Sequence, residues 1–199
     1  MNATMRLLPP LVLAVAAGLA ACASDPPTRF HSLQSATVAD TAAAPLPAVQ
    51  RLVDLGPVAV PPAVDQPQWV VRLPDGSLRV LEQERWVAPL RDELRAALLA
   101  GLRERQAAGD VRTAAPPAPA AWRVRVDVTR LDTLAGQGAW LEAGWTAVPP
   151  SGGAGFACAV SLREDASGDP LALAGAHRKA VGRLADRIGA SLAAGRCEG

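Results

Sequence analysis

The stretch Trp122-Arg123-Val124-Arg125-Val126-Asp127-Val128-Thr129 decides the fold class of this chain. Apolar and polar side chains alternate along it, and successive side chains of a strand point to opposite faces of a sheet. We therefore expect a strand with one buried face and one open face. Arg123 and Arg125 lie on the open face, where solvation is the expected role and contact with a partner is the alternative.

More strands are predicted on both sides of this stretch. Residues 140–148 and 156–162 form apolar strand patterns joined by Gly152-Gly153, which predicts a turn between them. Upstream, residues 70–73 and 78–81 flank Pro74-Asp75-Gly76-Ser77, and an Asp-Gly pair between two apolar runs indicates a hairpin.

Two shorter segments complete the predicted sheet. Residues 52–60 are apolar but contain Gly56-Pro57, which predicts an edge strand or a bulge. Phe30-His31-Ser32-Leu33 predicts a short first strand.

Two amphipathic helices are predicted. Leu90, Leu94, Leu98 and Leu102 recur every four residues, and Pro89 suits the first turn, so Trp86 is expected just ahead of this helix. The second helix is expected from about residue 171 to 193. Its apolar stripe consists of Leu173, His177, Val181, Leu184, Ile188 and Leu192.

These elements predict an α+β fold. Three consecutive strands with short links favour antiparallel pairing, and two helices with one apolar stripe each fit one face of a sheet. We expect a two-layer sandwich, with a mainly antiparallel sheet and both helices packed on one face. Ala107 to Ala121 contains Pro116-Pro117-Ala118-Pro119 and is expected to be a loop.

The N-terminus has the pattern of a bacterial lipoprotein signal. A short segment with Arg6 precedes the apolar run Leu11 to Leu19, which is too short to span a bilayer. Leu19, Ala20 and Ala21 then form the processing site, and Cys22 supplies the thiol to which lipid is attached. The alternatives are a simple secretory signal cleaved near Ala21 and a buried cysteine in an ordinary first helix.

The predicted organisation has three parts. Residues 1–21 are the signal peptide, residues 22–50 are the lipidated N-terminus, tether and short first strand, and residues 51–196 are the folded domain. Processing would remove Arg6, so the formal net charge would fall from +1 to about zero. That charge gives no net electrostatic attraction to nucleic acid, and acyl chains would supply the anchoring. Ala23, rather than aspartate, after the cysteine favours the outer membrane.

The sequence shows no constellation of residues for catalysis or metal binding. His31 lies in the tether region, and His177 lies on an apolar helix stripe, where a packing role is expected. No His, Cys and Asp cluster has metal-ligand spacing. The acidic residues near the first helix, Glu82, Glu84, Asp92 and Glu93, are expected to complement its dipole. We predict no enzymatic activity, no metal and no cofactor.

Two further cysteines remain after Cys22. Cys158 shares strand parity with Phe156, Val160 and Leu162, and Cys197 follows the last helix, which is expected to pack on the same side. In an oxidising compartment the two form either a disulfide or two unpaired thiols, one of them buried.

Several segments resemble the PqiC-like (YmbA-like) ABC-type transport auxiliary lipoproteins. The similar stretches are Leu55-Gly56-Pro57-Val58-Ala59-Val60-Pro61, Asp65 to Arg72, Glu84 to Leu90, Trp140 to Trp145 and Ala176 to Ile188. Phe30 to Leu33 lies where that family has a "YY-x-L" strand. Gln66 and His31 depart from the family pattern.

The resemblance implies transport without catalysis. Members partner MCE-domain tunnel proteins and inner-membrane ABC transporter components in lipid transport between membranes. The implied role is docking or sealing of the periplasmic tunnel at the outer membrane, with a likeness to a ring-forming homo-oligomer. Two alternatives remain: a lipoprotein that regulates cell-wall synthesis or another envelope complex, and a periplasmic enzyme.

Overall fold

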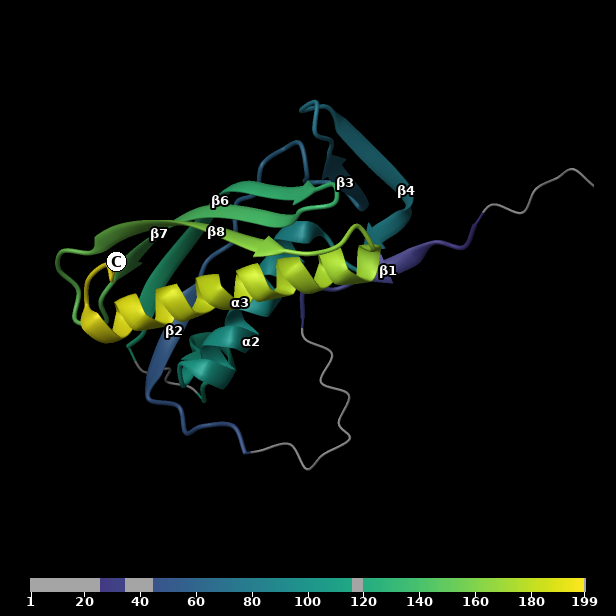
Figure 1. Ribbon diagram of the computed structural model, residues 1–199. Helices are drawn as coiled ribbons and strands as arrows, with labels where there is room; N and C mark the ends of the chain where they lie inside the picture. The colour runs from purple at the N-terminus through teal and green to yellow at the C-terminus, as the bar shows by residue number, and fades with distance from the viewer. Residues whose placement is uncertain (1–25, 35–44, 116–119, 199) are drawn as a thin grey trace, which may run out of the picture.

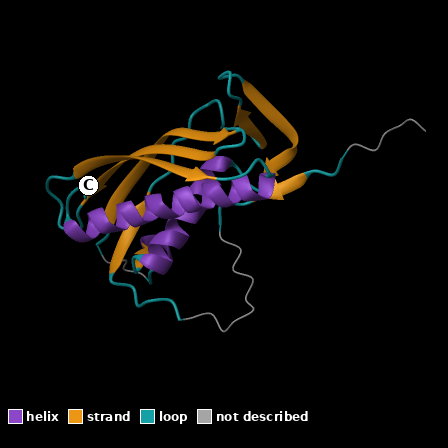
Figure 2. Ribbon diagram, viewed as in Figure 1, coloured by secondary structure: helices purple, strands orange, loops and turns teal. Residues whose placement is uncertain are grey.

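A computed structural model describes residues 26–34, 45–115 and 120–198. One mixed sheet of eight strands forms the first layer, and two long helices form the second (Figures 1 and 2). The α+β class and the helices on one face are confirmed. The strands are β1 (Arg29–His31), β2 (Arg51–Leu55), β3 (Gln68–Arg72), β4 (Leu78–Trp86), β5 (Ala108–Asp110), β6 (Trp122–Leu134), β7 (Gly138–Val148) and β8 (Phe156–Asp165).

The long pairings of the sheet are antiparallel, as predicted. β3 and β4 form the hairpin, in which Gly76 takes a φ of 86° that favours glycine. β6 pairs with β7, and β7 pairs with β8. The short pairings are parallel and were not predicted: β1 with β4, β2 with β5, and β6 with both β2 and β3.

β6 is the centre of the sheet. β7 follows it along one edge, while β2 pairs with its beginning and β3 with its end along the other edge. The predicted alternation over residues 122–129 is confirmed, since Val124, Val126 and Val128 are buried while Arg123 and Arg125 are exposed.

Two expectations about the strands are wrong. Of the two alternatives for residues 52–60, an edge strand or a bulge, the edge strand is wrong, because β2 lies between β5 and β6; β2 ends before Gly56-Pro57. The chain meets β6 again at an isolated bridge between Ala59 and Asp127. The proline-rich loop is not entirely irregular, because β5 and the 3-10 helix η1 (Val111–Thr113) lie within residues 107–121.

The two helices are α2 (Leu90–Arg105) and α3 (Pro170–Ala194). In α2 all four predicted leucines are buried, and Pro89 is the N-cap rather than a first-turn residue. Asp169 caps α3 by accepting a hydrogen bond from the Ala172 amide at 3.2 Å. The predicted apolar stripe of α3, His177 included, is buried throughout.

Candidate functional site

Two segments that are far apart in the sequence form the walls of an apolar groove at the start of α2. The groove has a volume of about 380 Å³, and its lining comprises Asp65, Gln66, Pro67, Trp86, Val87, Ala88, Pro89, Leu90 and Arg91. The Trp86 amide donates to the Pro67 carbonyl at 2.9 Å, and an ion pair between Arg91 and Asp65 joins the two walls.

The backbone at the end of β4 shapes this groove. Trp86 is the last residue of β4 and turns its ring inward, so Val87 points outward and is 58 % exposed. Pro89 is the N-cap of α2, and its carbonyl accepts from the Asp92 and Glu93 amides at 2.8 and 3.0 Å. The groove therefore presents apolar side chains to solvent on a backbone that is fixed by hydrogen bonds.

An aromatic cluster supports the floor of the groove. The rings of Trp69 and Trp86 are 5.0 Å apart, and each lies 5.9 Å from the ring of His177. Trp69 Nε1 donates to the Thr133 hydroxyl at 2.6 Å, and that hydroxyl lies 2.7 Å from His177 Nε2. The cluster joins β3, β4, β6 and α3 behind the groove.

His177 occupies a packing position, 1 % exposed. Burial lowers its pKa to about 4, while the charge of Asp132 acts in the opposite direction. The imidazole is therefore neutral at pH 7. Because the Thr133 hydroxyl already accepts from Trp69, it can donate to Nε2, which leaves the proton on Nδ1. Nδ1 has no hydrogen-bond partner among the described residues.

The first strand is fastened to the domain by two buried carboxylates. Glu84, which is 5 % exposed, lies 2.6 Å from His31 Nε2 and 2.9 Å from Arg29. Glu93 accepts from the Ser32 hydroxyl at 2.7 Å and from the Leu33 amide at 2.8 Å.

The expectation that these acidic residues only complement the helix dipole is therefore incomplete. Glu84 belongs to β4, and Glu93 in the first turn of α2 also binds the β1 segment. These contacts could not be predicted from sequence spacing, because each carboxylate lies about 50 to 60 positions from its partner in the β1 segment. The one available signal was the presence of a histidine in a short apolar strand.

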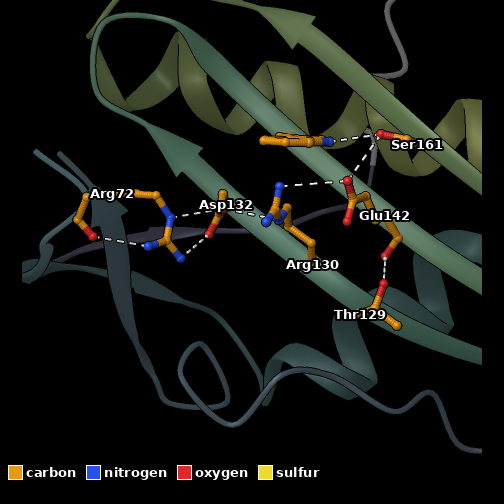
Figure 3. A network of polar contacts seen from close by, with 8 residues as sticks. Arg72, Thr129, Arg130, Asp132, Glu142 and Ser161 are labelled. Carbon is orange, nitrogen blue, oxygen red and sulfur yellow. Dashed lines mark hydrogen bonds and ion pairs between the residues drawn. The ribbon is translucent and has the colours of Figure 1, made fainter. Parts of the chain in front are cut away.

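The open face of the sheet carries a polar network (Figure 3). Arg72 makes two hydrogen bonds to Asp132, at 2.9 and 3.0 Å, and these raise the pKa of the Arg72 guanidinium. Arg130 lies 3.6 Å from Asp132 and 3.7 Å from Glu142. These contacts connect β3, β6 and β7.

Trp140 lies beside this network and contacts two arginines. The guanidinium carbons of Arg130 and Arg163 each lie 3.8 Å from the centroid of its ring. β7 lies between β6 and β8, so the two guanidinium groups reach the ring from opposite sides. Trp140 Nε1 donates to Ser161 at 2.9 Å.

The remaining predicted residues lie apart from the groove. A disulfide joins Cys158 on β8 to Cys197 after α3, with the Cα atoms 5.6 Å apart. Cys22 and its processing site, Leu19, Ala20 and Ala21, lie outside the described residues. Within residues 26–34, 45–115 and 120–198, no group of three or more His, Cys, Asp or Glu side chains could hold a metal ion.

The sheet and its single helical layer define an α+β domain with an exposed apolar groove. The chain belongs to the family of ABC-type transport auxiliary lipoprotein components, which matches residues 31–189. All groove residues except Arg91 come from two of the segments that carry the family resemblance, Asp65 to Arg72 and Glu84 to Leu90.

Solved structures agree on the fold. One, of a protein described as uncharacterized, matches with a TM-score of 0.66 at 16% identity, covering 84% of this chain and 99% of its own. Protein XCC0632 from Xanthomonas campestris, of the family DUF330, matches with a TM-score of 0.55 at 20% identity, covering 85% and 94%. No curated protein sequence matches the chain.

The family places the chain among membrane-associated lipoproteins of ABC-type transport. Among the helices of the described part, none is long and apolar enough to cross a membrane.

Proposed function

We propose that this protein is a non-catalytic, lipid-anchored docking subunit of an ABC-type system that moves lipids between membranes. Its partners are an MCE-domain tunnel protein and the inner-membrane ABC transporter components. The domain docks to the tunnel, or seals it, on the periplasmic face of the outer membrane, and it works as a homo-oligomer.

The organisation of the chain follows from this role. Residues 1–21 are removed as a signal peptide after Ala21, and Cys22 then carries the acyl chains. Residues 22–50 form the tether and the first strand, and residues 51–196 form the docking domain.

The groove is the observation that carries the proposal. A hydrophobic contact needs an exposed apolar surface that keeps its shape before the partner arrives, because ordering that surface on binding costs free energy. Val87 is 58 % exposed, while Trp86 behind it is 5 % exposed and packed against Trp69. An apolar segment of a partner can therefore bury itself between Pro67 and Pro89 without a change in the domain.

The chemistry of the groove suits binding rather than bond cleavage. Its two charged residues, Asp65 and Arg91, are paired with each other. The imidazole of His177, which packs against Trp86, is buried and is neutral at pH 7. A hydrolase would need an accessible nucleophile beside its base, and the groove lining contains no serine, cysteine, threonine or histidine.

Co-purification of the acylated protein in mild detergent tests the proposal. The unaltered protein should recover MCE-domain and ABC transporter components, and Val87→Asp should reduce that recovery because it puts a charge into the groove. Val80→Asp is the matched control, since Val80 is 40 % exposed in β4, the strand that leads to Val87, but lies outside the groove.

Two results would contradict the proposal in different ways. Equal recovery with both variants would mean that the groove is not the docking surface. Failure of the intact, acylated protein to recover any transport component would argue against the transport role itself.

A further inference from the structure

We infer that the end of the domain formed by β1 and the start of α3 lies on the lipid surface, with Phe30 and Leu171 inserted at the level of the headgroups. The inference rests on the proposed acylation of Cys22. It adds an orientation, and it names lipid as the partner of a surface that is separate from the groove.

The anchor leaves the domain at a fixed point. Thr28 Oγ1 donates to Gln83 at 3.1 Å, and Arg29 pairs with Glu84 at 2.9 Å. Arg178 of α3 donates to the carbonyl of Ser32 at 3.2 Å. The chain is thus bound to both β4 and α3 from residue 28 onward.

The anchor can reach only a short distance from the domain. Cys22 precedes Thr28 by six residues, which span at most about 22 Å when fully extended. α3, which has 25 residues, is about 37 Å long, and its first half contacts the β1 segment. Its last turn lies at the opposite end of the domain, beside the disulfide and the β7–β8 turn (Figure 1). The β1 end is therefore the one that the anchor holds at the membrane.

The surface at the β1 end carries exposed apolar side chains. Phe30 is 63 % exposed, although the other described aromatic side chains are buried or half-buried. Leu171, in the first turn of α3, is 66 % exposed. Exposed aromatic and leucine side chains are favoured at the boundary between headgroups and acyl chains.

Arginine side chains accompany Phe30. Arg29 is largely exposed although it pairs with Glu84, and Arg85 lies directly across from Phe30 in the β1–β4 ladder. Guanidinium groups bind phosphate oxygens through two parallel hydrogen bonds. An apolar tip beside arginines fits a phospholipid surface better than it fits an apolar protein groove.

A fluorescence experiment on the acylated full chain tests the orientation. With Cys22 acylated and Cys158 bonded to Cys197, Leu171→Cys gives a single free thiol for an environment-sensitive label. Ser151→Cys, in the exposed β7–β8 turn at the far end, is the matched control. The vesicles contain phosphatidylethanolamine and phosphatidylglycerol, with nitroxide quenchers on the acyl chains.

The label at position 171 should be quenched by the lipids, and the label at position 151 should not. Phe30→Asp should abolish the quenching at position 171 while the protein still sediments with the vesicles. Equal quenching at both positions, or quenching that survives Phe30→Asp, would overturn the inference. If position 171 becomes shielded only after transport proteins are added, this end contacts a protein partner. That result would also overturn the inference.

This experiment separates the orientation from the proposed function. The vesicles contain no transport protein, so a failed co-purification leaves the quenching result unaffected. Loss of sedimentation of the unaltered protein would show that the anchor is absent, and this would overturn the inference at its first premise.

Discussion

The hydroxyl of Thr133 lies 2.7 Å from Nε2 of His177, and this contact joins the end of β6 to α3 inside the core. The same hydroxyl accepts from Trp69 at 2.6 Å, so one small polar group satisfies two buried nitrogens. The groove wall formed by Trp86 depends on this arrangement, because the Trp86 ring packs against both Trp69 and His177.

His177 should make the domain less stable in mild acid. Its pKa falls from 6.5 in the unfolded chain to about 4 in the folded protein, so between these values the unfolded state binds a proton that the folded state does not. Stability from this group is present above pH 6.5 and is lost as the pH falls toward 4. Between pH 7.5 and 4.5 the loss should be roughly 2 to 3 kcal/mol.

Urea unfolding of the processed Cys22→Ser chain at the two pH values measures this loss. His177→Leu removes the imidazole, so the variant should lose less stability on acidification than the parent. An equal loss in both proteins would show that His177 does not carry the effect.

Glu93 should hold the first strand in place. Glu93→Gln removes the charge that binds the Ser32 hydroxyl and the Leu33 amide, and should cost about 1 to 3 kcal/mol of stability. Amide hydrogen exchange in residues 29–33 should become faster. Asp92→Asn is the matched control, because Asp92 is in the same helical turn but exposed, and it should change stability by only about 0.5 kcal/mol. If the two variants behave alike, Glu93 acts only on the helix dipole.

The disulfide between Cys158 and Cys197 should be measurable in solution. The processed Cys22→Ser protein should show no free thiol under denaturing, non-reducing conditions. The bond closes a loop with a sequence separation of 39, so Cys197→Ser should lower the free energy of unfolding by about 4 kcal/mol. Two titratable thiols in the unreduced protein would contradict the bond.

Acylation should depend on Cys22 alone. Cys22→Ser should abolish lipid attachment and membrane retention while the domain keeps its circular dichroism spectrum and thermal unfolding. Cys197→Ser should keep its acyl chains, which controls for the loss of any cysteine. Membrane fractionation and mass spectrometry of the N-terminal peptide provide the readouts, and membrane retention of the Cys22→Ser protein would exclude the anchor as its cause.

Much of the fold could be predicted because it depends on local periodicity. The alternation at residues 122–128 and the four-residue spacing of Leu90 to Leu102 both report which side chains face the core. The Asp75-Gly76 hairpin could be predicted for a similar reason, since its turn places β3 beside β4.

The parallel pairings could not be predicted in this way. β1 pairs with β4 although more than 50 residues separate them, and strand patterns do not encode which strand lies alongside which. β5 has three residues, Ala108-Gly109-Asp110, whose composition resembles a loop. Its place in the sheet comes from pairing with β2, so tertiary contacts override its weak strand propensity.

From the sequence, the groove segments could be recognised by their resemblance to the family, but the surface that they form together could not be predicted. Nothing in the spacing of Pro67 and Pro89 shows that they face each other, because β4 and its hairpin lie between them. The buried partners of His31 and His177 were hidden for the same reason.

The parallel pairing of β1 with β4 has a mechanical consequence. With Cys22 acylated as proposed, a pull on the anchor along β1 would act on the N-terminal end of that strand. The hydrogen bonds of the ladder run across the strand, so they resist the pull together, in shear, instead of opening one at a time. The contacts of Arg29 and His31 with Glu84, and of Ser32 with Glu93, share the load and pass it to β4 and α2. Tension between the proposed anchor and a bound partner would thus be carried by β1, one of the two three-residue strands of the sheet, in the direction in which its ladder is strongest.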